Sequence, residues 1–151
     1  MAFEPDIVVT DPESAQFALV VEVKAESRGL GESVRQLKTF MLGAGCPIGL
    51  LVTPERLWIL RDQYLSSSED SIAEVGEFDV KDVLNFRPSG AAGRDALAFE
   101  RLVQSWIEGL STESGLRELP AGLRGAAEMY IVPAISQGVV RAGHPRYSLS
   151  A

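Results

Sequence analysis

Two charged residues end a segment that is otherwise rich in apolar side chains. Residues 17–24 read Phe-Ala-Leu-Val-Val-Glu-Val-Lys. Successive side chains of a strand point to opposite faces of a sheet, so Glu22 and Lys24 share one face. Because both faces are otherwise apolar, the pattern favours a strand inside a sheet, where a charge is costly unless it is paired or binds an ion. Glu22 and Lys24 are therefore candidates for chemistry.

A predicted hairpin brings a second carboxylate to the same place. The β-branched run at 7–10 and the segment at 17–24 are separated by turn-forming residues, a pattern typical of two antiparallel strands. We centre this hairpin at Ser14. Val8 then faces Val20, Thr10 faces Ala18, and Asp6 faces Glu22. A slip of one residue would undo this arrangement.

Asp6 and Glu22 are accordingly predicted to be metal ligands. Opposed side chains in an antiparallel pair have Cβ atoms about 4.5–5.5 Å apart, and like charges there destabilise the sheet. A divalent cation such as Mg²⁺, which prefers carboxylate oxygens, makes the same pair favourable. Lys24, on the same face, would place a positive charge beside the metal, suited to a phosphate oxygen or an attacking water.

Residues 5–61 predict the core of a mixed sheet. Helical spacing of apolar residues indicates a helix over 32–42, and two further strands are expected at 48–53 and 57–60. The helix is long enough to connect two parallel strands by a right-handed crossover. The expected fold class is α/β, with a hairpin, a crossover helix and two more strands in one central sheet.

The rest of the chain is predicted to flank this core, within a single domain over 1–151. Residues 62–91 form an acidic region with an exposed loop at 64–77, and residues 92–151 form a helical C-terminal part. Its helices are expected at 95–110 and at 121–135, the second interrupted near Pro133, followed by a loosely held tail from 143 to 151.

The composition excludes several classes of function. Fourteen lysines and arginines against 21 aspartates and glutamates give a net charge of −7, so a nucleic acid needs a local basic patch, such as residues 24–61. The single histidine, His144, leaves little room for zinc sites or Ser-His-Asp catalysis, and we expect it to be an exposed tail residue. The single cysteine, Cys46, favours a cytoplasmic setting, and no apolar run reaches the roughly 20 residues of a membrane span.

Three short motifs follow one another along the predicted hairpin and helix. Pro5-Asp6 is followed by Glu22-Val23-Lys24 and then by Gln36-Leu-Lys-Thr-Phe40. Over roughly residues 5–61 the chain thereby resembles the PD-(D/E)XK nuclease superfamily. It is similar to the nuclease domains of type I restriction enzymes and RecB-like nucleases. The resemblance implies a restriction-endonuclease-like fold and cleavage of nucleic acid with Mg²⁺ or Mn²⁺ as the cofactor.

The resemblance also implies a role for each motif residue. Asp6 and Glu22 would bind the metal with help from the carbonyl of Val23. Lys24 would position or activate water, and Gln36 would contact the substrate or the Lys24 side chain.

Two departures from that family are visible. Phe40 stands where the family has a tyrosine, and the first core helix, which often supplies another acidic ligand, is absent because only five residues precede Asp6. A partner subunit could complete the fold, the C-terminal helices could fill the space, or this start could be a truncated or degenerate version.

Structural roles are open for the same residues. Asp6 could be an ordinary acid at the start of a strand, with Glu22 and Lys24 forming an edge-strand ion pair. Gln36 also fits a capping box with Ser33, in which the two side chains satisfy amides at a helix end.

Basic and aromatic residues outside the motifs allow further interpretations. Arg28, Arg35 and Lys38 belong either to a solvated helix face or to a surface that contacts phosphates. Trp58 and Trp106 lie in apolar stripes and are expected in the core.

The sequence thus leads to two hypotheses. The first is a Mg²⁺-dependent nuclease that hydrolyses phosphodiester bonds of DNA. The alternative is a catalytically inactive nucleic-acid-binding or assembly module of the same fold. A homodimer is also expected, with helices in 92–135 as the contact, because the apolar stripe from Phe99 to Leu110 needs a surface to cover it.

Overall fold

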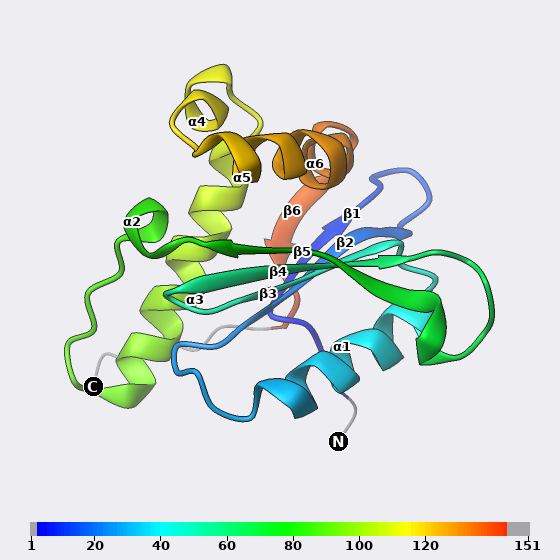
Figure 1. Ribbon diagram of the computed structural model, residues 1–151, viewed down its shortest axis with the longest axis horizontal. Helices are drawn as coiled ribbons and strands as arrows, with labels where there is room; N and C mark the ends of the chain where they lie inside the picture. Colours follow the sequence, from blue (N-terminus) through cyan, green and yellow to red (C-terminus); the bar gives the residue numbers. More distant parts are fainter. Residues whose placement is uncertain (1–2, 145–151) are drawn as a thin grey trace.

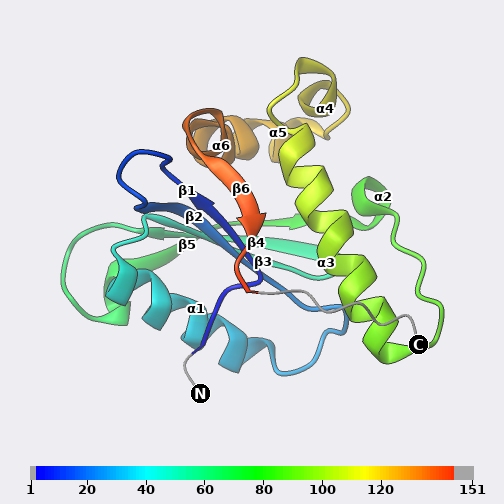
Figure 2. The same ribbon diagram turned by 180° about the vertical axis from the view of Figure 1, so that it is seen from behind.

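The computed structural model describes residues 3–144 as one mixed α/β unit built around a six-stranded sheet (Figures 1 and 2). The strands are β1 (Ile7–Thr10), β2 (Phe17–Val23), β3 (Ile48–Val52), β4 (Arg56–Asp62), β5 (Ile72–Asp79) and β6 (Val139–Ala142). Their order across the sheet is β5-β4-β3-β2-β1-β6. Only the β2–β3 pair is parallel. The predicted mixed α/β class is therefore confirmed.

Helices cover both faces of this sheet. They are α1 (Leu30–Ala44), a 3₁₀ turn (Glu69–Ser71), α2 (Lys81–Leu84), α3 (Ala92–Gly109), α4 (Glu113–Arg117), α5 (Ala121–Ala126), a π-helical turn (Ala127–Ile131) and α6 (Val132–Gln137). Helix α1 lies on one face, and α3, α5 and α6 lie on the other (Figures 1 and 2). Within residues 3–144 no helix is both long and apolar enough to cross a membrane.

The β1–β2 hairpin has the predicted register near its open end. Val8 pairs with Val20 and Ile7 with Val21, as expected, whereas a bulge after Val9 pairs Thr10 with Phe17 instead of Ala18. The bulge adds one residue near the turn and leaves the pairs farther along unchanged. Asp6 immediately precedes Ile7, so the hairpin brings it to the end of β2 that contains Glu22.

Helix α1 provides the predicted crossover between the parallel strands β2 and β3, and it buries Leu37 and Met41 against the sheet. The helix begins after Gly29, whose φ of 66° lies in the left-handed region. The proposed capping box is therefore wrong. Ser33 lies inside the helix and its Oγ donates to the Gly29 carbonyl over 3.2 Å, so Gln36 is too far along to cap the helix end.

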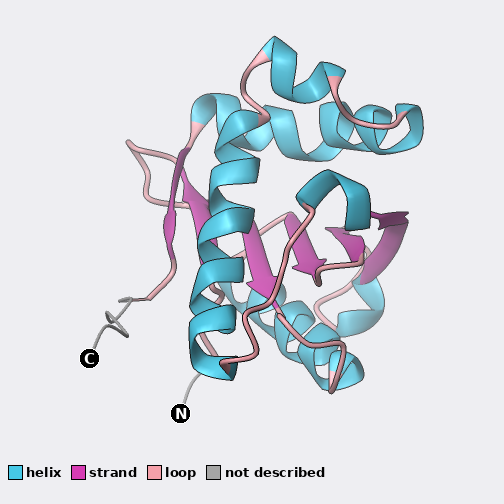
Figure 3. Cartoon of the chain, turned by 90° about the vertical axis from the view of Figure 1, so that its left-hand side faces the viewer, coloured by secondary structure: helices cyan, strands magenta, loops and turns pink. Residues whose placement is uncertain are grey.

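The apolar stripe of α3 is buried by the chain's own sheet. Phe99, Val103, Ile107 and Leu110 are at most 1% exposed, and Figure 3 shows α3 lying in front of the strands. Trp106 is partly buried against the same core. The stripe therefore needs no partner, which removes the reason for placing a dimer contact there. The homodimer stays a prediction.

Two strands occur where the sequence analysis expected none. The predicted exposed loop at 64–77 is confirmed over 64–70 and is wrong from Ile72 onward, where the chain forms β5 along the edge of the sheet. An edge strand keeps one side in solvent, so it tolerates acidic residues such as Glu74 and Glu77. At the opposite edge, β6 pairs with β1, and its short, half-exposed sequence gives little periodic signal.

The predicted C-terminal helix is present but interrupted. A π-helical turn over Ala127–Ile131 separates α5 from α6 just before Pro133. Proline has no N–H to donate within a helix, and such turns accommodate the missing bond. Of the predicted loose tail, Gly143 and His144 are held against the site described below, and 145–151 lie outside the described residues.

Replacing Phe99 by alanine tests the packing of α3. Phe99 is fully buried, and its ring centroid lies 4.9 Å from that of Phe86. We expect Phe99→Ala to lower the free energy of unfolding by about 3–5 kcal/mol in urea titrations. Leu65→Ala, at a residue that is 76% exposed, should change it by less than about 0.5 kcal/mol. Similar losses in both variants would contradict this packing.

Candidate functional site

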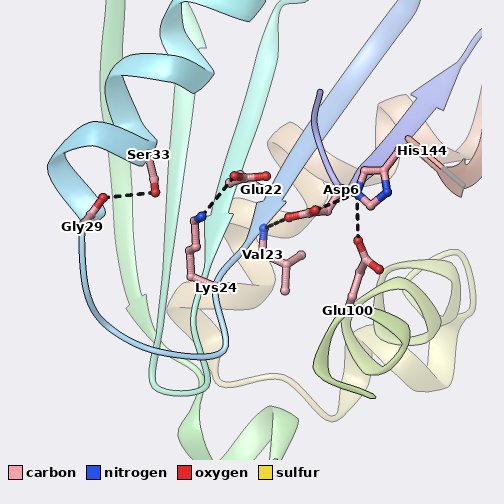
Figure 4. A network of polar contacts seen from close by, with 8 residues as sticks. All are labelled: Asp6, Glu22, Val23, Lys24, Gly29, Ser33, Glu100 and His144. Atoms are coloured by element: carbon pink, nitrogen blue, oxygen red, sulfur yellow. Dashed lines mark hydrogen bonds and ion pairs between the residues drawn. The ribbon is translucent and has the colours of Figure 1, made fainter. Parts of the chain in front are cut away.

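Asp6 lies at the centre of a polar cluster at the open end of the β1–β2 hairpin (Figure 4). Its Oδ2 accepts a hydrogen bond from the backbone N–H of Val23 over 2.8 Å. Its backbone carbonyl accepts another from Gly143 N–H, which continues the pairing beyond β6. These bonds hold the Asp6 carboxylate beside Glu22. Its Oδ1 points away from Glu22, toward His144.

Glu22 is a buried carboxyl that lacks a full set of partners. The residue is 5% exposed, and its Oε2 lies 3.6 Å from Lys24 Nζ. Its other oxygen, Oε1, accepts no hydrogen bond from residues 3–144. Burial, reinforced by the neighbouring Asp6 carboxyl and only partly offset by Lys24, raises the pKa of Glu22 to about 9. The surroundings thus supply too little positive charge to stabilise the ionised form of the Glu22 carboxyl.

Lys24 has a side chain that is partly exposed to solvent and also contacts Glu22. Its side chain is 38% exposed, and its backbone N–H donates to the Val52 carbonyl, so the β2–β3 pairing fixes its position. The ammonium can therefore contact both Glu22 and a ligand that approaches from solvent. The structure brings together Asp6, Glu22 and Lys24 as the sequence predicted, with Val23 contributing its N–H to Asp6.

Two further residues complete the cluster from the other side of Asp6. His144 Nε2 lies 2.9 Å from Asp6 Oδ1 and 3.4 Å from Glu100 Oε1. The expectation of an exposed tail histidine is wrong, because the pairing of β6 with β1 brings His144 to Asp6 and leaves its side chain 31% exposed. Glu100 comes from α3 and is 7% exposed, so a C-terminal helix supplies an acid here.

A weak signal for Glu100 exists in the sequence. It stands three residues before Val103 and seven before Ile107, and both of these belong to the buried stripe of α3. A charged residue in line with a buried helical stripe is unusual and indicates a partner. For His144 the sequence offers no comparable signal, since its position depends on a strand that the pattern did not predict.

The remaining predicted site residues lie apart from this cluster. Gln36 lines a separate cleft together with Phe3 and Phe40, and no polar contact between described residues joins it to Lys24. Arg28 and Arg35 are exposed and form ion pairs with Glu26 and Glu32. Lys38 lies on the same helix as Arg35. The two arginines thus have carboxylate partners within the chain and remain exposed to solvent.

A cleft of about 560 Å³ opens beside His144. Its lining includes Glu4 and Pro5 from the chain before β1, Arg141 from β6, and the rings of Phe17 and Phe40. The cleft thus places a guanidinium and two aromatic rings beside His144, whose ring contacts Asp6.

Comparisons of the chain with protein-family models, with curated proteins and with solved structures found no match.

The raised pKa of Glu22 predicts a pH-dependent stability in the presence of EDTA. The folded pKa of about 9 exceeds the ordinary value of 4.5, so the folded state binds the proton more tightly than the unfolded state. The stabilisation is complete below about pH 4.5 and is lost as the pH rises toward 9. The free energy of unfolding of Glu22→Gln, relative to that of the parent, should therefore rise by roughly 1–4 kcal/mol from pH 5 to pH 8.

Denaturant titrations at the two pH values measure this difference. Glu74→Gln, which changes an exposed strand carboxylate, serves as the matched control and should show almost no pH-dependent difference. A Glu22→Gln difference that stays flat with pH would show that Glu22 ionises normally.

Proposed function

We propose that the protein is a Mg²⁺-dependent nuclease that hydrolyses phosphodiester bonds of DNA. One observation carries this proposal: Asp6 and Glu22 lie side by side at the end of a central strand, with Lys24 Nζ 3.6 Å from Glu22. The order hairpin, crossover helix, parallel strand and further antiparallel strand supports the resemblance to PD-(D/E)XK nucleases.

The residues fit a divalent cation. Glu22 Oε1 is buried without a hydrogen-bond donor among residues 3–144, and the Asp6 carboxyl lies next to it. Hard cations bind carboxylate oxygens, and a bound cation would remove the cost of ionising Glu22. Asp6 and Glu22 would hold Mg²⁺ or Mn²⁺ together with the Val23 carbonyl.

Hydrolysis then requires an oriented water and compensation of the negative charge that develops on the phosphate. The bound cation would supply Lewis-acid stabilisation of that charge. Lys24 contributes a fixed positive charge and three hydrogen-bond donors, which can orient the attacking water and contact a phosphate oxygen. The Val23 N–H holds Asp6 in place, so the ligand carboxylate does not have to reorganise.

DNA would bind in the cleft beside His144. Arg141 lines it and can contact a phosphate, while Phe17 and Phe40 offer surfaces on which a base can stack. Because the net charge of the chain is −7, binding would depend on such local contacts and weaken with added salt.

A catalytically inactive binding or assembly module is the second candidate. It is favoured by the position of Gln36, which lines another cleft and has no polar contact with Lys24 among the described residues. A module of this kind would bind DNA and leave it intact.

Cleavage assays on plasmid, linear and single-stranded DNA test the proposal. With Mg²⁺ or Mn²⁺ we expect cleavage by the parent, complete inhibition by EDTA, and a loss of at least about 100-fold in Glu22→Gln and in Lys24→Ala. Lys24→Ala should retain metal binding, because its role concerns water and phosphate. Glu74→Gln, the exposed control, should cleave like the parent.

The outcomes separate the two candidates. If every DNA substrate stays intact while the protein binds DNA in a salt-sensitive way, the nuclease proposal is wrong and the binding module is favoured. Cleavage that is equal in the parent and in Glu22→Gln would indicate a contaminating enzyme and contradict the proposed site.

A further inference from the structure

His144 and Glu100 form a second group of ligand atoms around Asp6, opposite Glu22 (Figure 4). One carboxylate oxygen from each of Asp6 and Glu100 and one ring nitrogen of His144 lie within 4.8 Å of one another. Asp6 lies just before β1, Glu100 lies in the middle of α3, and His144 lies just after β6. Three separate parts of the chain therefore converge on one point.

The spacing suits a single ion. Metal–ligand bonds of about 2.1 Å place two ligands of one ion roughly 3.0 to 3.4 Å apart at right or tetrahedral angles. The His144 nitrogen lies 2.9 Å from the Asp6 oxygen and 3.4 Å from the Glu100 oxygen. The Asp6 and Glu100 oxygens lie within 4.8 Å of each other and would have to approach the same range around a shared cation.

The donor set also selects a kind of ion. Carboxylates suit both Mg²⁺ and Mn²⁺, whereas an imidazole nitrogen is a typical ligand of transition ions such as Zn²⁺ and not of Mg²⁺. Glu100 is 7% exposed, and Glu22, on the other side of Asp6, has a buried oxygen without a donor within residues 3–144. A cation bound at Asp6 would therefore lie close to a buried carboxylate oxygen that has no donor among the described residues.

We propose that Asp6, Glu100 and His144 bind a divalent transition-metal ion, with His144 Nε2 as a direct ligand, and that this site binds Mn²⁺ more tightly than Mg²⁺. The inference deepens the proposed function, because Asp6 belongs to both sites. It concerns metal binding on the α3 side of Asp6 and does not require cleavage.

The backbone around Gly143 holds His144 in position. Gly143 N–H donates to the Asp6 carbonyl over 2.9 Å, and a Cβ at residue 143 would lie 2.0 Å from the Pro5 carbonyl oxygen. Any other residue would push this backbone away from Asp6. Gly143→Ala should therefore weaken Mn²⁺ binding even though all three ligand side chains remain.

The single histidine makes a direct test possible. His144 is the only histidine in 151 residues, so labelling the full chain with ¹⁵N-histidine, on a protein without a histidine tag, reports one imidazole alone. Titration with Zn²⁺ should shift the ring ¹⁵N resonance assigned to Nε2 strongly, and equal Mg²⁺ should shift it little. With Mn²⁺, electron spin echo spectra should show coupling to the labelled nitrogen.

Calorimetric titration of variants supplies the affinities. His144→Ala and Glu100→Gln should each weaken Mn²⁺ binding by at least about tenfold, since even outer partners of ligands cost this much. Glu108→Gln, an exposed glutamate on the same helix, is the matched control and should bind like the parent. Loss of His144 should reduce the preference for Mn²⁺ over Mg²⁺.

Two results would overturn the inference. Absence of a Zn²⁺-dependent ring shift and of Mn²⁺–¹⁵N coupling would show that His144 only forms ion pairs with the two carboxylates. Equal Mn²⁺ affinity in the parent and His144→Ala would show the same. Glu22→Gln should retain the nitrogen coupling, so a failure of the nuclease proposal is distinguishable from a failure of this site.

Discussion

The burial of carboxyl groups around Asp6 is the constraint on which this site depends. Glu22 and Glu100 are 5% and 7% exposed, and an ionised carboxylate at such positions is costly without a compensating cation. Lys24 contacts Glu22 on one side of Asp6, and the His144 ring contacts Asp6 and Glu100 on the other. The hydrogen bond from Val23 N–H fixes the Asp6 carboxylate between them. Under the proposed function this arrangement would be preorganised for a cation, at a cost in stability that the surrounding core must offset.

The residues of this site come from the sheet layer and from helix α3, and from sequence positions as far apart as Asp6 and His144. The hairpin register fixes Asp6 beside Glu22, the parallel pairing with β3 fixes Lys24, and packing of the α3 stripe under the sheet brings Glu100 to the same end. The C-terminal helix α3 thereby contributes an acid, Glu100, to the site. Of the three explanations that the sequence left open for the missing first core helix, this contribution agrees best with C-terminal helices that fill the space. The same packing buries the stripe that had suggested a dimer.

Local patterns predicted the elements that have strong periodicity. The hairpin, the crossover helix and α3 follow from alternation and helical spacing, and the register that places Asp6 by Glu22 follows from a short turn. The edge strands β5 and β6 were missed because half-exposed, acidic or short segments lack that periodicity. His144 was missed with β6, since its contact with Asp6 spans 138 positions of sequence and depends on tertiary pairing alone. The capping box failed because a glycine in the left-handed region began the helix earlier.

The central claim is that Asp6 binds a divalent cation in the folded protein. Crystals of the parent grown with Mn²⁺, with diffraction data collected at the manganese absorption edge, test it directly. We expect an anomalous peak about 2.2 Å from an Asp6 carboxylate oxygen and shared with at least one of Glu22, Glu100 and His144. A map without a peak at Asp6 at saturating Mn²⁺, with His144 still in contact with that carboxylate, would contradict the account.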